Sequence, residues 1–118
     1  MTKFTIKFYN KNNGESPARE FVLSSDVKMR AKLLSLMEIL EEYGNHLREP
    51  YSKHLEDGIF ELRGKVGSNM SRIMYFFYHN KTIIITNGFI KKTQKIPKSE
   101  IDRAKRYRLD YIERCKKR

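Results

Sequence analysis

Three strand-like segments joined by very short turns constrain the fold of this chain more than any other feature. The segment Ile59–Val66 alternates apolar and charged residues, and the turn Gly67-Ser68-Asn69 separates it from residues 70–79. Asn80-Lys81 forms a second tight turn before Thr82–Ile90. Turns this short join antiparallel neighbours. Because residues 70–79 are apolar on both faces, the sequence predicts an antiparallel meander with this segment as a central strand.

The N-terminal half combines one strand with two helices. A nearly alternating strand is expected over residues 3–9, and Ser16-Pro17 starts a short helix with Ser16 as its cap. A second helix is expected over residues 26–43, capped by Ser25-Asp26 and ended by Gly44, where a left-handed residue is favoured. This helix carries leucine and methionine at helical spacing, which indicates a face packed against the core.

The remaining segments complete the expected fold. Residues 45–58 have no periodic pattern and are expected to be irregular as far as the turn pair Asp57-Gly58. Pro97 opens a last helix whose basic end, up to Arg118, suits the helix dipole. The prediction is a single α+β domain over residues 1–118, in the order β-α-α-β-β-β-α, with a mainly antiparallel sheet and the helices packed on one side.

The positive charge of the chain lies entirely in its second half. The formal net charge is +11. Residues 1–58 contain nine Lys/Arg and nine Asp/Glu, whereas residues 59–118 contain sixteen Lys/Arg and five Asp/Glu. This asymmetry favours one face that binds nucleic acid and another with a different partner. The alternative is a soluble basic protein without a nucleic-acid ligand.

The single cysteine and the start of the chain indicate a cellular compartment. Cys115 has no cysteine with which to form an internal disulfide, which fits a reducing cytosol, and we expect it to be a small buried hydrophobe. Met1-Thr2-Lys3-Phe4 has no apolar signal core, and no segment reaches membrane-spanning length. We therefore expect a cytoplasmic protein that does not associate with a membrane.

Clustered cations are the candidate functional residues. Arg63 and Arg72 lie within otherwise core-like strands of one hairpin. Four lysines follow the end of the last strand: Lys91, Lys92, Lys95 and Lys98. A rigid strand end that presents several ammonium groups can hold a polyanion at a fixed place, so we interpret these residues as a phosphate-binding site. A solvated basic loop and two solvent-facing arginines are the alternative.

The register of the hairpin decides whether the two arginines act together. If Val66 and Met70 flank the turn, Arg63 lies opposite Ile73, and the arginines point to opposite faces of the sheet. A one-residue bulge would bring Arg63 and Arg72 to the same face. The sequence leaves this register open.

Other kinds of site have no support in the sequence. The histidines His46, His54 and His79 lack metal-ligand spacing, so no metal is expected. No phosphate-binding glycine loop, dinucleotide fingerprint or nucleophile elbow is present, and no cofactor is expected. Tyr107 and Tyr111, four residues apart on the last helix, could pack or stack on bases, and packing is favoured.

Three segments of the chain resemble one protein family. They are Gly-Ile-Phe-Glu-Leu-Arg at 58–63, Ser-Arg-Ile-Met-Tyr-Phe-Phe at 71–77 and Gly-Phe-Ile-Lys-Lys-Thr-Gln-Lys-Ile-Pro at 88–97. In order and spacing they resemble the phage-derived HigB-like branch of the RelE/ParE toxin superfamily, across essentially the whole chain. The resemblance implies a RelE-like fold and the toxin of a type II toxin–antitoxin system. Such a toxin cleaves mRNA at the ribosome, inhibits translation and is neutralised by a helix-turn-helix antitoxin of the HigA type.

The resemblance also implies roles for individual residues. Arg63 and Arg72 match strand residues that hold the scissile phosphate, and Lys91 and Lys92 match a basic site at the end of the last strand. Glu61 is the only carboxylate in the motif. Such toxins cleave without a metal, by attack of the ribose 2′-hydroxyl on the adjacent phosphate, and this reaction needs a base, an acid and cations. Further RNA contacts are expected from Lys65, Lys95, Lys98 and Arg106.

One departure from the family keeps other functions open. Some relatives have a histidine or tyrosine for proton transfer near the end of the last strand, where this chain has lysines, Thr93 and Gln94. Proton transfer would then depend on a lysine or on Glu61. One alternative is a non-catalytic ParE-like toxin that binds DNA gyrase. Another is a phage protein that binds a host factor without toxicity.

Overall fold

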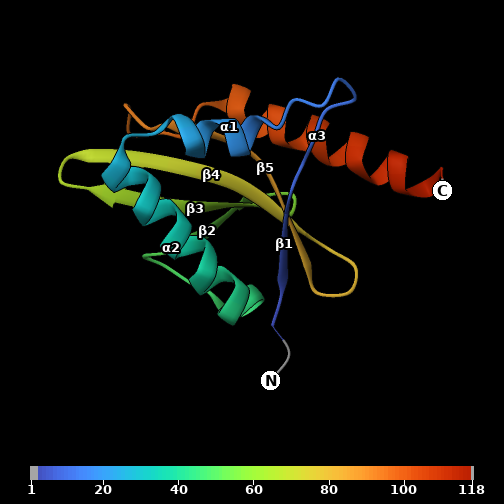
Figure 1. The fold of residues 1–118 in the computed structure, drawn as a ribbon, viewed down its shortest axis with the longest axis horizontal. Helices are drawn as coiled ribbons and strands as arrows, with labels where there is room; N and C mark the ends of the chain where they lie inside the picture. Colours follow the sequence, from blue (N-terminus) through green and yellow to red (C-terminus); the bar gives the residue numbers. More distant parts are fainter. Residues whose placement is uncertain (1–2, 118) are drawn as a thin grey trace.

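The computed structural model describes residues 3–117, and Figure 1 shows the arrangement of its helices and strands. Arg118, expected at the end of the last helix, lies outside the described residues. The elements in chain order are β1 (Thr5–Phe8), α1 (Pro17–Ser24), α2 (Val27–Tyr43), the short 3₁₀ helix η1 (Gly44–His46), β2 (Ser52–Glu56), β3 (Ile59–Val66), β4 (Asn69–Tyr78), β5 (Thr82–Ile90) and α3 (Lys98–Lys116). The predicted α+β class, compatible with a RelE-like fold, is confirmed.

The strands form one mixed sheet in the order β1-β5-β4-β3-β2. Strand β1 runs parallel to β5, and the other neighbours are antiparallel. The predicted bounds of β3 and β5 are confirmed, and β4 is displaced by one residue from the expected 70–79. Tyr78 pairs with Thr82, so the second turn has three residues, 79–81, rather than two. As predicted, β4 lies in the middle of the sheet, because both of its faces are apolar.

The expectation that residues 45–58 are irregular is wrong for Ser52–Glu56, which form the edge strand β2. This strand pairs with β3 through the turn Asp57-Gly58, whose residues have φ of 51° and 77°. Two consecutive positive φ values are typical of the tight hairpin turn that matches strand twist. Most β2 side chains are exposed or half-buried, so the segment lacks the alternation that reveals a strand.

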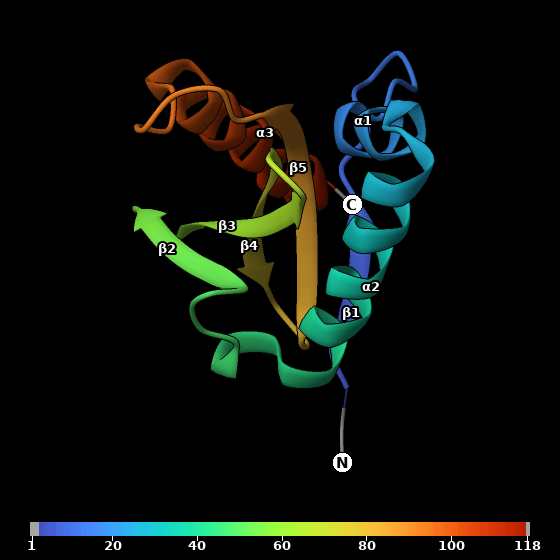
Figure 2. The same cartoon turned by 90° about the vertical axis from the view of Figure 1, so that its left-hand side faces the viewer.

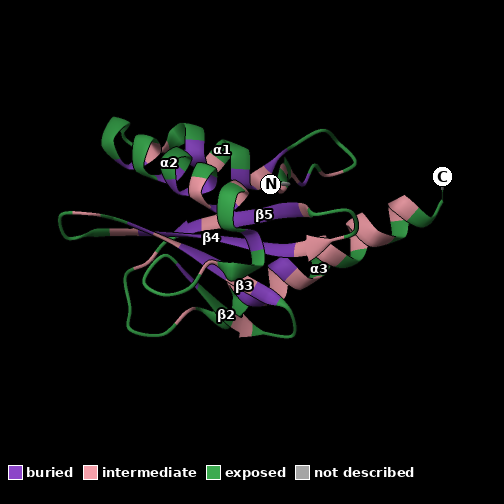
Figure 3. Cartoon of the chain, turned by 90° about the horizontal axis from the view of Figure 1, so that it is seen from below, coloured by how far each residue is buried: buried purple, intermediate pink, exposed green. Residues whose placement is uncertain are grey.

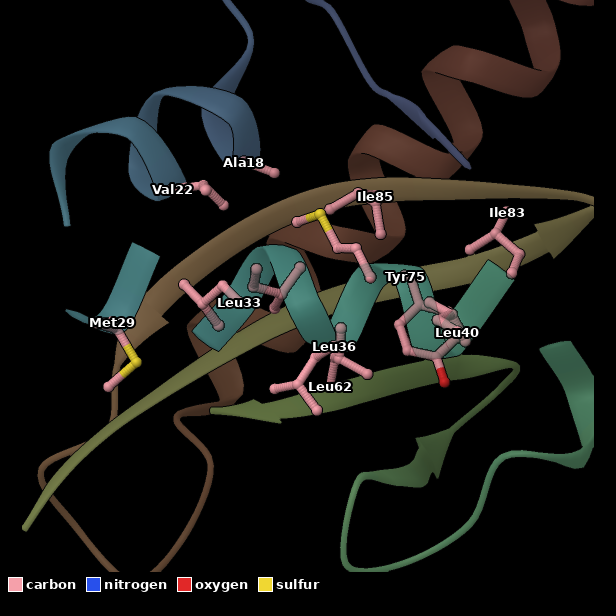
Figure 4. Packing of buried hydrophobic residues seen from close by; sticks show 12 residues of the cluster. Ala18, Val22, Met29, Leu33, Leu36, Leu40, Leu62, Tyr75, Ile83 and Ile85 are labelled. Carbon is pink, nitrogen blue, oxygen red and sulfur yellow. The ribbon is translucent and has the colours of Figure 1, made fainter. Parts of the chain in front are cut away.

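The helices cover both faces of the sheet, which corrects the expectation that they pack on one side. Figure 2 shows α1 and α2 along one side of the sheet and α3 on the other. Figure 4 shows the buried side chains of α1 and α2 together with the strand residues that they pack against, Leu62, Tyr75, Ile83 and Ile85. Helix α3 packs with the opposite face, through Ala104 against Ile59, Met74, Phe76 and Ile84. Figure 3 shows the buried residues concentrated in the strands between these layers.

The ends of the first two helices can be compared with the capping residues that the sequence predicts. The Asp26 carboxylate accepts a hydrogen bond from Met29 N at 2.9 Å, which confirms the predicted cap of α2. Gly44, at the end of α2, has the predicted positive φ of 52°. Ser16 precedes α1 as predicted, but its hydroxyl donates to the carbonyl of Tyr9 at 3.2 Å instead of capping the helix.

Helix α3 is tied to the β2–β3 turn by charged side chains. Lys105 pairs with Glu56, and Arg108 Nη2 donates to Asp57 Oδ2 at 2.9 Å. Cys115 near the end of α3 is half-buried, so the expectation of a fully buried thiol is wrong. None of the helices within residues 3–117 combines the length and apolar character needed to cross a bilayer.

The register of β3 and β4 places the two arginines on one face. Val66 pairs with Asn69, so the turn contains only Gly67 and Ser68, and Arg63 lies directly opposite Arg72. Of the alternatives that the sequence leaves open, the structure has the two arginines on one face, and no bulge between these strands is needed. One residue fewer in the turn shifts the pairing by one position, and this reverses the face to which a side chain points.

Candidate functional site

Glu61, Arg63 and Arg72 form a contiguous charged cluster, called here the arginine cluster. Arg63 Nε donates to Glu61 Oε2 at 2.9 Å. Arg72 Nε lies 3.1 Å from Glu61 Oε1, in an ion pair whose N–H is not directed at the oxygen. The side chains of Glu61 and Arg72 are 2% and 9% exposed, and that of Arg63 is 28% exposed. The alternative of two solvent-facing arginines is therefore wrong for Arg72, which is buried.

The arginine cluster has an unbalanced charge. Two guanidinium groups face one carboxylate, and two like charges directly opposite one another on adjacent strands destabilise a sheet. Burial lowers the pKa of Arg72 from its ordinary value, the nearby Arg63 lowers it further, and Glu61 opposes both effects. Guanidinium groups remain protonated in proteins, so the cluster keeps a net positive charge in a poorly hydrated place. Such a place favours an anion with several acceptor oxygens.

The arginine cluster opens into a surface hollow of about 520 Å³, called here the arginine hollow. No carboxylate lines it; its lining residues are Lys32, Leu36, Pro50, Tyr51, Arg63, Lys65, Gly67, Met70 and Arg72. The hollow lies beside the part of β3 beyond Ser52↔Leu62, the last pair that β2 makes with it. Four cations around one concave surface form a suitable site for the phosphates of a nucleic acid.

A glycine in β3 lets helix α2 approach this part of the sheet closely. A side-chain carbon added at Gly64 would lie 2.7 Å from Leu33 Cδ2 of α2. Only a residue without Cβ leaves room for this approach. The close contact places Lys32, the residue before Leu33, at the rim of the arginine hollow.

The lysine pair after β5 lines a second hollow, called here the lysine hollow. Lys91 and Lys92 border a space of about 590 Å³ near the β3–β4 turn. Lys91 N donates to Met70 O at 2.8 Å, and Lys91 Nζ donates to Gln94 O at 3.1 Å. Met70 lines both this hollow and the arginine hollow. The structure thus brings the lysine pair beside the arginines, but in an adjacent hollow.

The other predicted RNA-binding residues are distributed over the surface. Lys65 lines the arginine hollow and is exposed. Lys95, Lys98 and Arg106 are exposed on the loop before α3 and on α3 itself, where Lys98 pairs with Asp102 at 3.4 Å. Within residues 3–117, none of these three forms a hydrogen bond or ion pair with the arginine cluster.

Sequence reasoning missed Lys32 and Tyr51, both of which line the arginine hollow. Lys32 belongs to a helix interpreted only as core packing, and Tyr51 belongs to a segment expected to be irregular. No local pattern marks either residue, because the hollow is formed by the approach of α2 to β3. Residues 3–117 contain no cluster of three or more His, Cys, Asp or Glu placed to hold a metal ion.

The geometry can be compared with known families. Residues 20–108 match the family described as phage derived protein Gp49-like (DUF891). The chain belongs to this family. It is a RelE/HigB-like toxin family, so the resemblance noted in the sequence is confirmed at the level of a phage-derived toxin-like protein. The matched range runs from α1 into α3 and includes every residue that lines the arginine hollow. No curated protein matches the chain.

Proposed function

We propose that this Gp49-like protein is the toxin of a type II toxin–antitoxin system and cleaves mRNA at the ribosome without a metal ion. It belongs, in this proposal, to the HigB-like branch and acts in the cytoplasm, where a helix-turn-helix antitoxin neutralises it. The observation that carries the proposal is the arginine cluster, because a buried excess of positive charge beside a carboxylate-free hollow suits a phosphate.

The reaction assigned to the site is attack of a ribose 2′-hydroxyl on the adjacent phosphorus. The 5′-oxygen of the next nucleotide leaves, and the product strand ends in a 2′,3′-cyclic phosphate. Arg63 and Arg72 stabilise the additional negative charge on the phosphoryl oxygens in the transition state. Lys65 holds a neighbouring phosphate of the mRNA.

Glu61 has a positioning role in this proposal. Both of its oxygens face arginines, at 2.9 Å and 3.1 Å, so it orients the two guanidinium groups. A carboxylate engaged in this way is poorly placed to accept the proton of a 2′-hydroxyl. Proton transfer is therefore assigned to the lysine pair Lys91 and Lys92.

The second candidate is a ParE-like toxin that binds DNA gyrase without catalysis. One observation favours it: no histidine is among the residues that line the arginine hollow or the lysine hollow. A binding protein needs no acid or base. The two candidates differ in which process stops first after induction, translation or DNA synthesis.

The test is a brief induction of the protein in bacteria that lack the antitoxin, followed by primer extension on cellular mRNA. New 5′ ends should appear, and amino-acid incorporation should fall before thymidine incorporation. Arg63→Ala and Lys92→Ala should each reduce cleavage about a hundredfold, since loss of one transition-state cation has effects of this order. Cleavage by purified protein and ribosomes should continue in EDTA once magnesium is replaced by polyamines that keep the ribosomes intact.

The matched controls are Lys116→Ala and Lys117→Ala, which remove exposed charges at the end of α3. They should retain full cleavage. If the tail variants lose activity while Arg63→Ala and Lys92→Ala keep it, the charge is only a general RNA tether and the assigned site is wrong. An earlier fall in DNA synthesis than in translation would instead support the gyrase candidate.

A further inference from the structure

Tyr51 presents an exposed aromatic ring at the rim of the arginine hollow. It is 46% exposed, although its backbone is well held. Tyr51 N donates to Arg48 O at 3.0 Å, and Tyr51 O accepts from Arg63 N at 2.8 Å. The next residue, Ser52, is buried and hydrogen-bonded to the Tyr75 hydroxyl. Strand β3 thus fixes the backbone of Tyr51 directly beside the arginine that we assign to the phosphate.

Packing does not account for the Tyr51 ring. Tyr9 and Tyr107 stack with ring centroids 4.7 Å apart, and Tyr111 packs edge-on against Phe76. These contacts confirm the prediction that Tyr107 and Tyr111 are packing residues. Tyr51, in contrast, belongs to neither apolar cluster of the described residues. Within residues 3–117 its side chain makes no ring contact and no hydrogen bond.

Tyr51 also borders a third hollow, of about 440 Å³. The other residues lining this space are Ile39, Tyr43, His46, Leu47, Arg48 and Glu49. The ring therefore forms a wall shared by two adjacent concave surfaces. A polymer bound in the arginine hollow would meet the ring at the edge of that hollow.

We infer that Tyr51 stacks on a base of the single-stranded RNA whose phosphate Arg63 and Arg72 bind. The inference rests on the proposed function for the nature of the ligand. Sites for single-stranded nucleic acid combine cations that hold the phosphates with aromatic rings on which bases stack. The arginine hollow supplies the cations, and Tyr51 is the exposed aromatic residue in its lining. Because every base has a flat face, this contact positions the RNA without selecting its sequence.

The test separates stacking from charge by removing bases from the RNA. The probe is a short fluorescein-labelled RNA with 2′-O-methyl sugars, which cannot be cleaved by attack of a 2′-hydroxyl. Its partner is the same strand with abasic residues, and binding is measured by fluorescence anisotropy at low salt. The wild type and Tyr51→Phe should bind the abasic strand with an affinity at least about fivefold lower than that for the intact strand. Tyr51→Ala should bind the two strands equally.

Tyr43→Ala is the matched control. Tyr43 is another exposed tyrosine, 56% exposed, but it lines the third hollow and not the arginine hollow. This variant should retain the wild-type preference for the intact strand. Circular dichroism of each variant should match that of the wild type, because the Tyr51 ring belongs to neither apolar cluster of the described residues.

The possible outcomes separate this inference from the proposed function. Equal binding of both strands by the wild type, or an undiminished preference in Tyr51→Ala, overturns the stacking role, even if the wild type cleaves mRNA in cells. A base preference that depends on Tyr51 supports the stacking role, even if primer extension finds no cleavage and the nuclease proposal fails. If Tyr51→Ala binds both strands like the wild type but loses its antitoxin, the ring contacts protein and the inference is wrong.

Discussion

Replacement of Arg72 by methionine should destabilise the fold because it leaves Glu61 short of one cation. The Arg72 side chain is 9% exposed and its Nε lies 3.1 Å from the Glu61 carboxylate, which is 2% exposed. Breaking a buried ion pair from one side costs about 3–5 kcal/mol in general. Arg63 remains bound to Glu61, and loss of Arg72 removes its repulsion of Arg63, so we expect a smaller loss of about 1–2 kcal/mol from the free energy of unfolding. Methionine is chosen over alanine because it fills most of the space and isolates the effect of charge.

A double-mutant cycle measures this coupling directly. Urea unfolding followed by circular dichroism would compare the wild type, Arg72→Met, Glu61→Gln and the double variant. The double variant should be more stable than the sum of the two single losses predicts, since neither buried charge is then left without its partner. We expect a coupling energy above about 1 kcal/mol, in the range seen for residues in one ion-pair network.

The reasoning is refuted if Arg72→Met unfolds at the same urea concentration as the wild type, or if the two single losses simply add. A large coupling has a practical meaning for activity assays. Loss of cleavage in an Arg72 variant then reflects both the missing cation and a less populated fold. Arg63→Ala is the cleaner probe of the phosphate site, because Arg63 is more exposed and Glu61 keeps its buried partner.

Two further predictions concern the rest of the fold. Gly64→Val should lower the free energy of unfolding by about 1–3 kcal/mol, the usual effect of overpacking, because the new Cβ would lie 2.7 Å from Leu33 Cδ2. Thermal unfolding measures this loss. An unchanged melting temperature would mean that α2 does not pack closely against β3 at this position. Hydrogen bonding from Tyr9 holds the pKa of Asp110 below its ordinary value, so the stability from this carboxylate is complete above pH of about 4 and is lost as the pH falls through the lowered folded-state pKa. Urea unfolding of Asp110→Asn between neutral and acidic pH should show a shallower decline than the wild type, and parallel curves would contradict this role.

The sequence predicts the middle of the sheet well and the edge strand β2 poorly. Strands β3 and β5 have the predicted bounds because β-branched and aromatic residues alternate or cluster between clear turn signals. Strand β2 gives no such signal. Its residues Lys53, His54 and Glu56 are exposed, as is usual for a short strand at a sheet edge.

The position of α3 could have been inferred from β4. A strand that is apolar on both faces must be covered on both, and Met74 and Phe76 bury the face opposite Ile73 and Tyr75. The pattern of α3 itself shows an apolar face but does not tell which side of the sheet it meets.

The candidate site was predictable in its residues and not in its geometry. The arginines stand out because charged side chains are rare inside core-like strands. Whether they meet depends on one residue more or fewer in the turn at Gly67, which composition cannot decide. Tyr51 and Lys32 belong to the site only because tertiary packing brings α2, β3 and the segment before β2 together.

The place of Glu61 between two arginines has a consequence for the protein when no RNA is bound. Its carboxylate is a built-in counter-ion, so the empty protein does not need a phosphate or an antitoxin to neutralise Arg72 while it folds. An incoming phosphate must share both guanidinium groups with a carboxylate that is already in place. In the proposed reaction, this competition weakens binding of the substrate and of the cleaved strand alike, which would favour release of one message before attack on the next.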